Sequence, residues 1–204
     1  RCRYCKKPIS WQYPVVELAT TSLFILSYVF WPEPLRGAGL FDFLMWLPVL
    51  VALVALFVYD LKWMLLPNKI PYPLLVFVLG VALLHGAVYD RTLAYFGGLG
   101  LSAFIGGGLF YILFQVSSGK WIGGCDVKLG TVLGFVLADP AQALLMLFTA
   151  SSLGTIVSLP LLATHRAKAS SRIPFGPFLI VASVIVKIFG ASVIAWYRRN
   201  FLLV

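Results

Sequence analysis

Apolar runs close to the length that crosses a lipid bilayer make up most of the chain, with short polar connections between them. A transmembrane helix needs about 20 apolar residues. Runs near that length are Pro14–Trp31, Leu40–Tyr59, Ile70–Val88, Thr92–Val116, Ala141–Ala163 and Pro174–Tyr197. A shorter run, Val127–Ala138, fits a thin or tilted span. With that run included, we predict an all-α polytopic membrane protein of about seven transmembrane helices.

The composition excludes most other classes of protein. Only 11% of the residues are charged, and the mean hydropathy is +0.96. Soluble domains carry about 25% charged residues, so this chain cannot cover a water-facing surface, and lipid must be the solvent for most of it. Backbone groups in lipid are satisfied only within helices or a closed barrel. The runs are continuous rather than alternating, which excludes a barrel.

Basic residues divide unequally between the two sides of such a membrane protein. With the N-terminal segment in the cytoplasm, alternating loops assign eleven basic residues to that side: Arg1, Arg3, Lys6, Lys7, Lys62, Lys69, Lys120, Lys128, Arg166, Lys168 and Arg172. The opposite side receives four: Arg36, Arg91, Arg198 and Arg199. This asymmetry agrees with the positive-inside rule and depends on counting Val127–Ala138 as a span. Topology therefore accounts for the net charge of +9, and we expect no nucleic-acid partner.

Two acidic residues stand apart from the other five. Those assigned to the outer side or to the first helix are Glu17, Glu33, Asp42, Asp90 and Asp139. Asp60 and Asp126 lie on the cytoplasmic side, each at the end of an apolar run. Two carboxyls that meet where water can reach them can hydrolyse a peptide bond, because one accepts a proton from water while the other, protonated, donates to the carbonyl. Asp60 and Asp126 are therefore candidate catalytic residues; the alternative is two separate, solvated helix-end aspartates.

Five short motifs occur in a recognisable order. They are Cys2-Arg-Tyr-Cys5, Tyr13-Pro14-Val-Val-Glu17, Asp60-Leu-Lys-Trp-Met-Leu-Leu-Pro67-Asn68, Gly123-Gly124-Cys125-Asp126-Val-Lys128-Leu129 and Ser171-Arg-Ile-Pro174-Phe-Gly176-Pro-Phe178. Over essentially the whole chain, they resemble the motifs of type IV prepilin peptidases. The stretches around Asp126 and Gly176 are the most specific parts of this resemblance.

The resemblance implies an aspartyl endopeptidase of the inner membrane. Such enzymes cut the basic leader from type IV prepilins and pseudopilins at the cytoplasmic face, after a glycine, and their catalytic aspartates match Asp60 and Asp126. Many then methylate the new N-terminus with S-adenosylmethionine as donor. The implied partners are a prepilin or pseudopilin substrate and the lipid bilayer. Lys128 and Glu17 are candidate substrate-binding residues, although Lys128 could instead cap its loop and the Glu17 carboxylate complements a helix dipole.

The cysteines raise two further questions. Cys2 and Cys5 supply two ligands where a structural zinc takes four, which leaves zinc binding or two free thiols. The family has a second pair upstream, in a part that we expect to be missing before Arg1 together with an N-terminal helix, and methylation is tied to that region. We therefore expect residues 1–13 to be a cytoplasmic Cys-containing remnant and residues 14–204 to be the transmembrane peptidase domain.

Cys125 departs from the family pattern Gly-x-Gly-Asp around the second aspartate. Glycine allows backbone geometry and close approach that a Cβ penalises, whereas cysteine is small and tolerates burial. Retained activity, reduced activity and an inactive binding partner of the pilus machinery all follow as alternatives. Two other readings are a different intramembrane aspartyl protease, of the preflagellin peptidase or presenilin type, and a small transporter that uses the two aspartates as a proton or cation relay.

Overall fold

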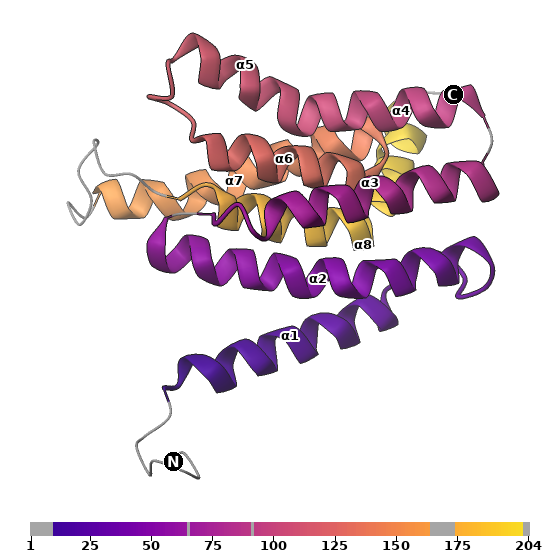
Figure 1. Cartoon of the computed structure of the whole chain (residues 1–204), viewed down its shortest axis with the longest axis horizontal. Helices are drawn as coiled ribbons and strands as arrows, with labels where there is room; N and C mark the ends of the chain where they lie inside the picture. The colour runs from indigo at the N-terminus through magenta and orange to yellow at the C-terminus, as the bar shows by residue number, and fades with distance from the viewer. Residues whose placement is uncertain (1–9, 65, 91, 164–173, 202–204) are drawn as a thin grey trace.

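The structure is a computed structural model, and the part it describes comprises residues 10–64, 66–90, 92–163 and 174–201. Its helices are α1 (Gln12–Val29), α2 (Ala38–Trp63), α3 (Pro71–Val88), α4 (Leu93–Ala103), α5 (Leu109–Val116), α6 (Gly124–Leu137), α7 (Pro140–Ala163) and α8 (Gly176–Phe201). A π-helical turn, η1 (Phe104–Gly108), joins α4 and α5 into one rod. The rods run roughly along one direction as a bundle, with α1 at its edge (Figure 1).

Five rods in the described part of the chain are long and apolar enough to cross a membrane: Ala38–Trp63, Pro71–Val88, Leu93–Val116, Pro140–Pro160 and Gly176–Phe201. The prediction of an all-α polytopic membrane protein is confirmed. The predicted short span Val127–Ala138 corresponds to α6, which has 14 residues and extends about 21 Å. That is less than the roughly 30 Å of a hydrocarbon core, so α6 is a short helix that packs within the bundle.

Close backbone contact holds α6 against the rod formed by α4 and η1. A Cβ at Gly106 would overlap the carbonyl oxygen of Gly130, and a Cβ at Gly134 would lie 2.6 Å from the carbonyl oxygen of Ser102. The Ser102 hydroxyl donates to the Gly134 carbonyl at 2.7 Å. Small residues let helices approach in this way inside membranes. Gly106 belongs to the glycine-rich tract 97–108, and its missing side chain is what lets this rod approach α6 so closely.

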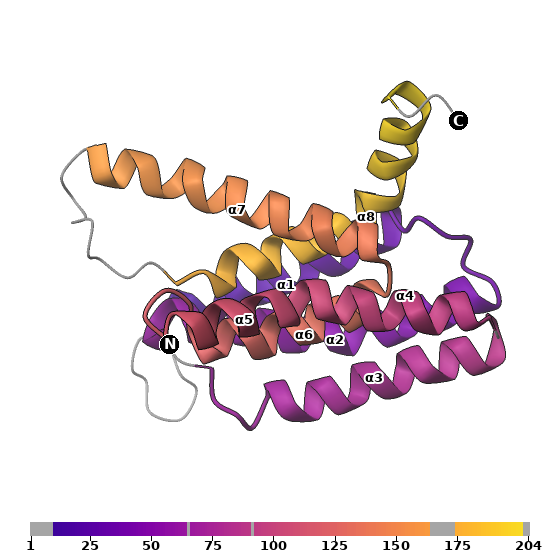
Figure 2. The ribbon, with the colours of Figure 1, turned by 90° about the horizontal axis from the view of Figure 1, so that it is seen from above.

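Helix direction gives the bundle two chemically distinct ends. At one end α2 and α5 finish and α3, α6 and α8 begin; we call it the aspartate end, because Asp60 and Asp126 lie there. At the opposite end α1, α3 and α6 finish and α2, α4 and α7 begin. Seen from above, α7 and the C-terminal part of α8 spread away from the rest of the bundle (Figure 2).

Candidate active site

Asp60 continues a buried stripe along α2. Leu53 and Leu56 precede it on the same helical face and are fully buried, and Asp60 itself is only 5% exposed. The helix stops shortly afterwards, because Met64 adopts a left-handed φ of 51° while its N–H donates to the Asp60 carbonyl at 2.8 Å. The predicted position at the end of an apolar segment is thus correct, with the side chain in the last turn of the helix.

Asp126 occupies the first turn of α6. Its N–H donates to the Gly123 carbonyl at 3.0 Å, and its carboxylate lies where the positive end of the helix dipole favours negative charge. Asp126 is partly buried and outside the five candidate spans. Burial, followed by the negative charge of Asp60, raises the pKa of Asp126 to about 6.

The fold therefore brings the two aspartates within range of electrostatic interaction. The two residues are 66 positions apart in the chain and belong to different helices, α2 and α6. Both lie at the aspartate end. The negative charge of Asp60 is the second cause, after burial, that raises the pKa of Asp126. Like charges this close do not ionise together easily, so the pair favours a state with one proton. Such a state can donate and accept a proton at the same time.

Gly176 closes the site from the start of α8. This buried glycine lies so near Asp60 that a Cβ there would overlap Oδ2 and come within 3.2 Å of Cγ. The ring of Phe175 beside it packs edge-on against Phe110, with centroids 5.9 Å apart. In the sequence, Gly176 contributes to a motif that supports the resemblance, but the pattern alone assigns it no role. The motif places Gly176 between Phe175 and Pro177, but only the structure shows that Gly176 contacts Asp60.

Lys128 ties the start of α6 to the connection between α2 and α3. Its Nζ donates to Asn68 Oδ1 at 2.7 Å and lies 5.1 Å from the centre of the Tyr72 ring. Asn68 belongs to the same motif as Asp60, so this contact joins the two aspartate motifs. The structure thus gives Lys128 a role in joining the two motifs, and substrate binding by Lys128 stays a prediction.

The remaining predicted site residues are not joined to the aspartates. Glu17 lies exposed on α1, and its carboxylate forms no hydrogen bond or ion pair with the residues that the structure describes. The start of α1 does reach the aspartate end, because Lys62 Nζ donates to Gln12 Oε1 at 2.9 Å. Cys2 and Cys5 lie outside the described residues, and within those residues no group of three His, Cys, Asp or Glu side chains could hold a metal ion.

The fold and the paired acids describe a multi-pass membrane protein with an acidic site at one end of its bundle. Residues 47–159 match the model of the type IV leader peptidase family, and residues 1–31 match that of the bacterial Peptidase A24 N-terminal domain. The chain belongs to the type IV leader peptidase family.

Relatives extend this likeness over nearly the whole chain. The chain is 34% identical to a prepilin leader peptidase/N-methyltransferase of Aeromonas hydrophila, over 99% of this chain and 67% of that protein. It is 28% identical to the protein of that name from Bacillus subtilis, over 98% of this chain and 75% of the relative. A Pseudomonas aeruginosa relative of the same name is 31% identical, over 98% and 66%. The chain thus spans from about two thirds to three quarters of their length, and no solved structure matches it.

Proposed function

We propose that this chain is an aspartyl endopeptidase that removes the leader peptide from type IV prepilins or pseudopilins, with Asp60 and Asp126 as its catalytic residues. The observation that carries the proposal is that both carboxyls lie at one end of the bundle, where the charge of Asp60 contributes to the raised pKa of Asp126. The names of the relatives support prepilins as the substrate class.

The chemistry follows from a pair that holds one proton. The ionised carboxyl takes a proton from a water molecule, whose oxygen bonds to the scissile carbonyl carbon, while the protonated carboxyl donates to the carbonyl oxygen. The resulting tetrahedral diol collapses when its C–N bond breaks and a proton passes to the leaving nitrogen. The products are a new carboxyl on the leader and a free amine on the mature chain. Both catalytic groups regain their starting protonation together.

The position of the pair favours a peptidase over a membrane relay. Asp60 lies in the last turn of α2 and Asp126 in the first turn of α6, so both are at the end of the bundle rather than at its middle. A proton or cation relay would place its acids along a path through the membrane. The excess of basic residues in the loops of the aspartate end supports a cytoplasmic position for that end. A prepilin leader would meet the pair there.

Methylation of the new N-terminus is a second activity that we propose for this chain, with S-adenosylmethionine as methyl donor. Its support is the word N-methyltransferase in the names of the relatives and the match of residues 1–31 to the N-terminal domain of the family. Cys2 and Cys5 are candidate zinc ligands in this region, and one pair fills two of the four ligand positions of a structural zinc. Transfer of a labelled methyl group to pre-cleaved pilin, with and without Cys2→Ser and Cys5→Ser, tests this activity separately from cleavage.

Cleavage of a prepilin by the full chain in detergent tests the main proposal. We expect mass spectrometry to find the leader and a mature pilin whose new N-terminus follows the leader glycine. A prepilin variant with that glycine replaced by a bulky residue is the matched control and should stay intact. Failure to cut the normal prepilin, or cutting at unrelated sites, would contradict the proposal.

A further inference from the structure

A second polar site lies at the opposite end of the bundle. A cavity of about 310 Å³ is lined there by residues of α2, α3, α6 and α8. Its acidic and basic lining residues are Glu33, Asp42, His85, Asp139 and Lys187. Asp42 and Asp60 are 18 residues apart on α2, which corresponds to about 27 Å along the helix. The cavity is therefore separate from the candidate active site by nearly the thickness of a hydrocarbon core.

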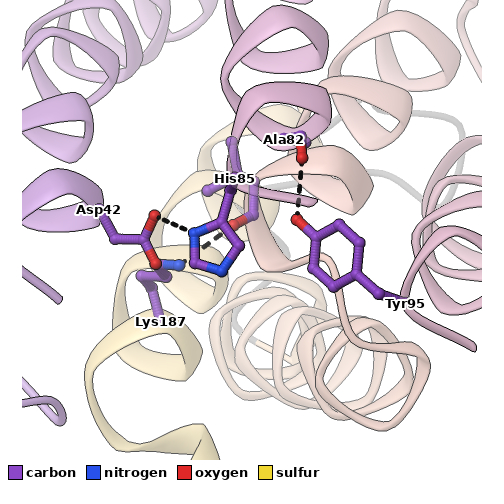
Figure 3. A network of polar contacts seen from close by, with 6 residues as sticks. Asp42, Ala82, His85, Tyr95 and Lys187 are labelled. Atoms are coloured by element: carbon purple, nitrogen blue, oxygen red, sulfur yellow. Dashed lines mark hydrogen bonds and ion pairs between the residues drawn. The ribbon is translucent and has the colours of Figure 1, made fainter. Parts of the chain in front are cut away.

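One wall of the cavity is a fixed pair between α2 and α3. His85 Nδ1 lies 2.9 Å from Asp42 Oδ1, and their side chains are 18% and 19% exposed. Tyr95 stacks on the His85 ring at a centroid distance of 5.6 Å and donates its hydroxyl to the Ala82 carbonyl at 3.1 Å. Figure 3 shows these side chains converging from different helices beside Lys187. The stacking and hydrogen bonds hold this acidic wall in place.

The facing wall carries a cation without a matched anion. Lys187 lies within the long apolar helix α8, and its Nζ donates to the Val136 carbonyl at 3.3 Å. No carboxylate of the described residues is within 4.0 Å of this Nζ. Charged groups inside membrane helices are costly and usually serve a function.

A neighbouring donor also lacks an acceptor. The buried Trp31 Nε1 has no hydrogen-bond partner among the residues that the structure describes. The Lys187 ammonium lies 5.8 Å from the centre of the same Trp31 ring. An unpaired buried donor costs about 1–3 kcal/mol. Of these two donors, Lys187 lines the cavity, and its ammonium has donor capacity left beyond the Val136 carbonyl for an anionic oxygen-bearing group.

The cavity thus offers a cation on one wall and carboxylates on the other. Its inner part is lined by apolar side chains, among them Val49, Val78 and Phe135. Its volume lies at the lower end of the roughly 300–1,000 Å³ of small-molecule pockets, which suits a headgroup better than a whole lipid. We propose that this cavity binds the headgroup of a zwitterionic, amine-bearing phospholipid, with its phosphate at Lys187 and its ammonium at Glu33 and Asp42.

The position of the cavity favours a lipid as its occupant. The cavity lies at the end of the bundle where the candidate spans Ala38–Trp63 and Leu93–Val116 begin and Pro71–Val88 ends. The acyl chains of a lipid bound there would extend along the apolar outer faces of the bundle. The cavity joins α2, α6 and α8, whose other ends carry Asp60, Asp126 and Gly176. A bound headgroup would therefore hold together the helices that position the candidate active site.

Native mass spectrometry of the delipidated full chain in detergent tests this inference. The probes are phosphatidylethanolamine, phosphatidylglycerol with the same acyl chains, and soluble glycerophosphoethanolamine. We expect phosphatidylethanolamine to be retained over phosphatidylglycerol, because only the former carries an ammonium. Equal retention of the two lipids overturns the proposal. Displacement by glycerophosphoethanolamine at equal concentration would identify a soluble zwitterion as the ligand and overturn the lipid assignment.

Charge-removing variants locate the bound lipid. Lys187→Met and Glu33→Gln should each weaken retention of phosphatidylethanolamine about tenfold, the effect of losing one charge-assisted hydrogen bond. Glu33 is exposed on the connection between α1 and α2, so its variant keeps the test valid if Lys187→Met does not fold. Matched controls are Lys120→Met and Arg36→Gln, two exposed cations outside the cavity lining. Unchanged preference in Glu33→Gln, or an equal loss in the controls, contradicts the assignment.

Discussion

Gly176 lies directly against the carboxyl of Asp60, so close that any side chain at position 176 would overlap Oδ2. The start of α8 therefore forms one side of the candidate active site, although it follows Asp60 by more than a hundred residues. A glycine at this point leaves room for the carboxyl in the last turn of α2 and brings backbone instead of side chain next to it.

We expect Gly176→Ala to slow prepilin cleavage by about fivefold to a hundredfold, because overpacking costs of about 1–3 kcal/mol would displace the Asp60 carboxyl. Gly100→Ala is the matched control, since a Cβ at that helical glycine meets nothing within 4 Å. Single-turnover cleavage measures both variants, with thermal unfolding to show that each folds. Wild-type cleavage by folded Gly176→Ala would mean that the contact does not matter for catalysis.

Two features can be predicted from the sequence for physical reasons: the fold class, and the placement of Asp60 and Asp126 on a different side of the membrane from the acids assigned to the outer side. Long apolar runs leave helices as the available structure in lipid, and loop charges order those helices across the membrane. Neither signal contains distances between helices. The contact of Gly176 with Asp60 and the bond from Lys128 to Asn68 depend on how α8 and α6 pack, which no local pattern encodes.

The cavity at the opposite end of the bundle also depends on contacts between helices that the sequence does not predict. In the sequence, Asp42 belongs to the acids of the outer side and Lys187 lies within the apolar run Pro174–Tyr197, and nothing in the pattern connects the two. An ionisable residue within a membrane helix calls for a partner or a function, so Lys187 alone could have flagged the region. The residues that face Lys187 could not be predicted, because they come from α2 and α3 and are brought there by tertiary packing.

The departure at Cys125 should matter little for activity. In the structure this residue is part of helix α6 and is not among the residues with positive φ, so its backbone does not require glycine. Its side chain packs partly buried against the hydrophobic core. We expect Cys125→Gly to change the cleavage rate by less than about twofold and to lower the free energy of unfolding by about 0.5–1 kcal/mol. A large gain in activity would show that the cysteine impairs the site.

Lys128 and Asn68 should be energetically coupled. A double-mutant cycle of Lys128→Met and Asn68→Ala, measured by thermal unfolding, should give a coupling of about 0.5–3 kcal/mol, because the two side chains share one hydrogen bond. Lys120→Met with Asn68→Ala is the uncoupled control. Steady-state cleavage adds a second readout: if Lys128 binds the substrate, its variant raises KM beyond the effect of Asn68→Ala. Additive stability effects of the first pair would contradict the tie.

The charge of Asp60 should be visible in the titration of Asp126. The pKa of Asp126 is raised from 3.8 to about 6, first by burial and then by Asp60. In the Asp60→Asn variant we expect that pKa to fall but to stay above 3.8, because burial remains. Carbon-13 NMR of aspartate carboxyls in micelles measures this midpoint, with Asp90→Asn as the control. An unchanged midpoint in Asp60→Asn would show that the two carboxyls do not interact.

The same shift has a defined sign for stability. A carboxyl with a raised folded pKa binds protons more tightly in the native state, so its contribution is fully present below about pH 4. We expect that contribution to be lost as the pH rises from about 4 through 6. Thermal unfolding across this range should show a smaller pH dependence in Asp126→Asn than in the wild-type protein. An equal dependence would assign it to other groups.

Cleavage of purified prepilin by the Asp60→Asn and Asp126→Asn variants tests the central claim most directly. Each substitution keeps the shape of the side chain but removes its ability to exchange a proton, so we expect each to reduce cleavage by at least about a thousandfold. Asp139→Asn is the matched control, because Asp139 caps α7 at the opposite end of the bundle through the Ala141 N–H at 2.7 Å. Loss in both dyad variants with activity retained in the control is the predicted result; wild-type cleavage by either folded dyad variant would contradict it.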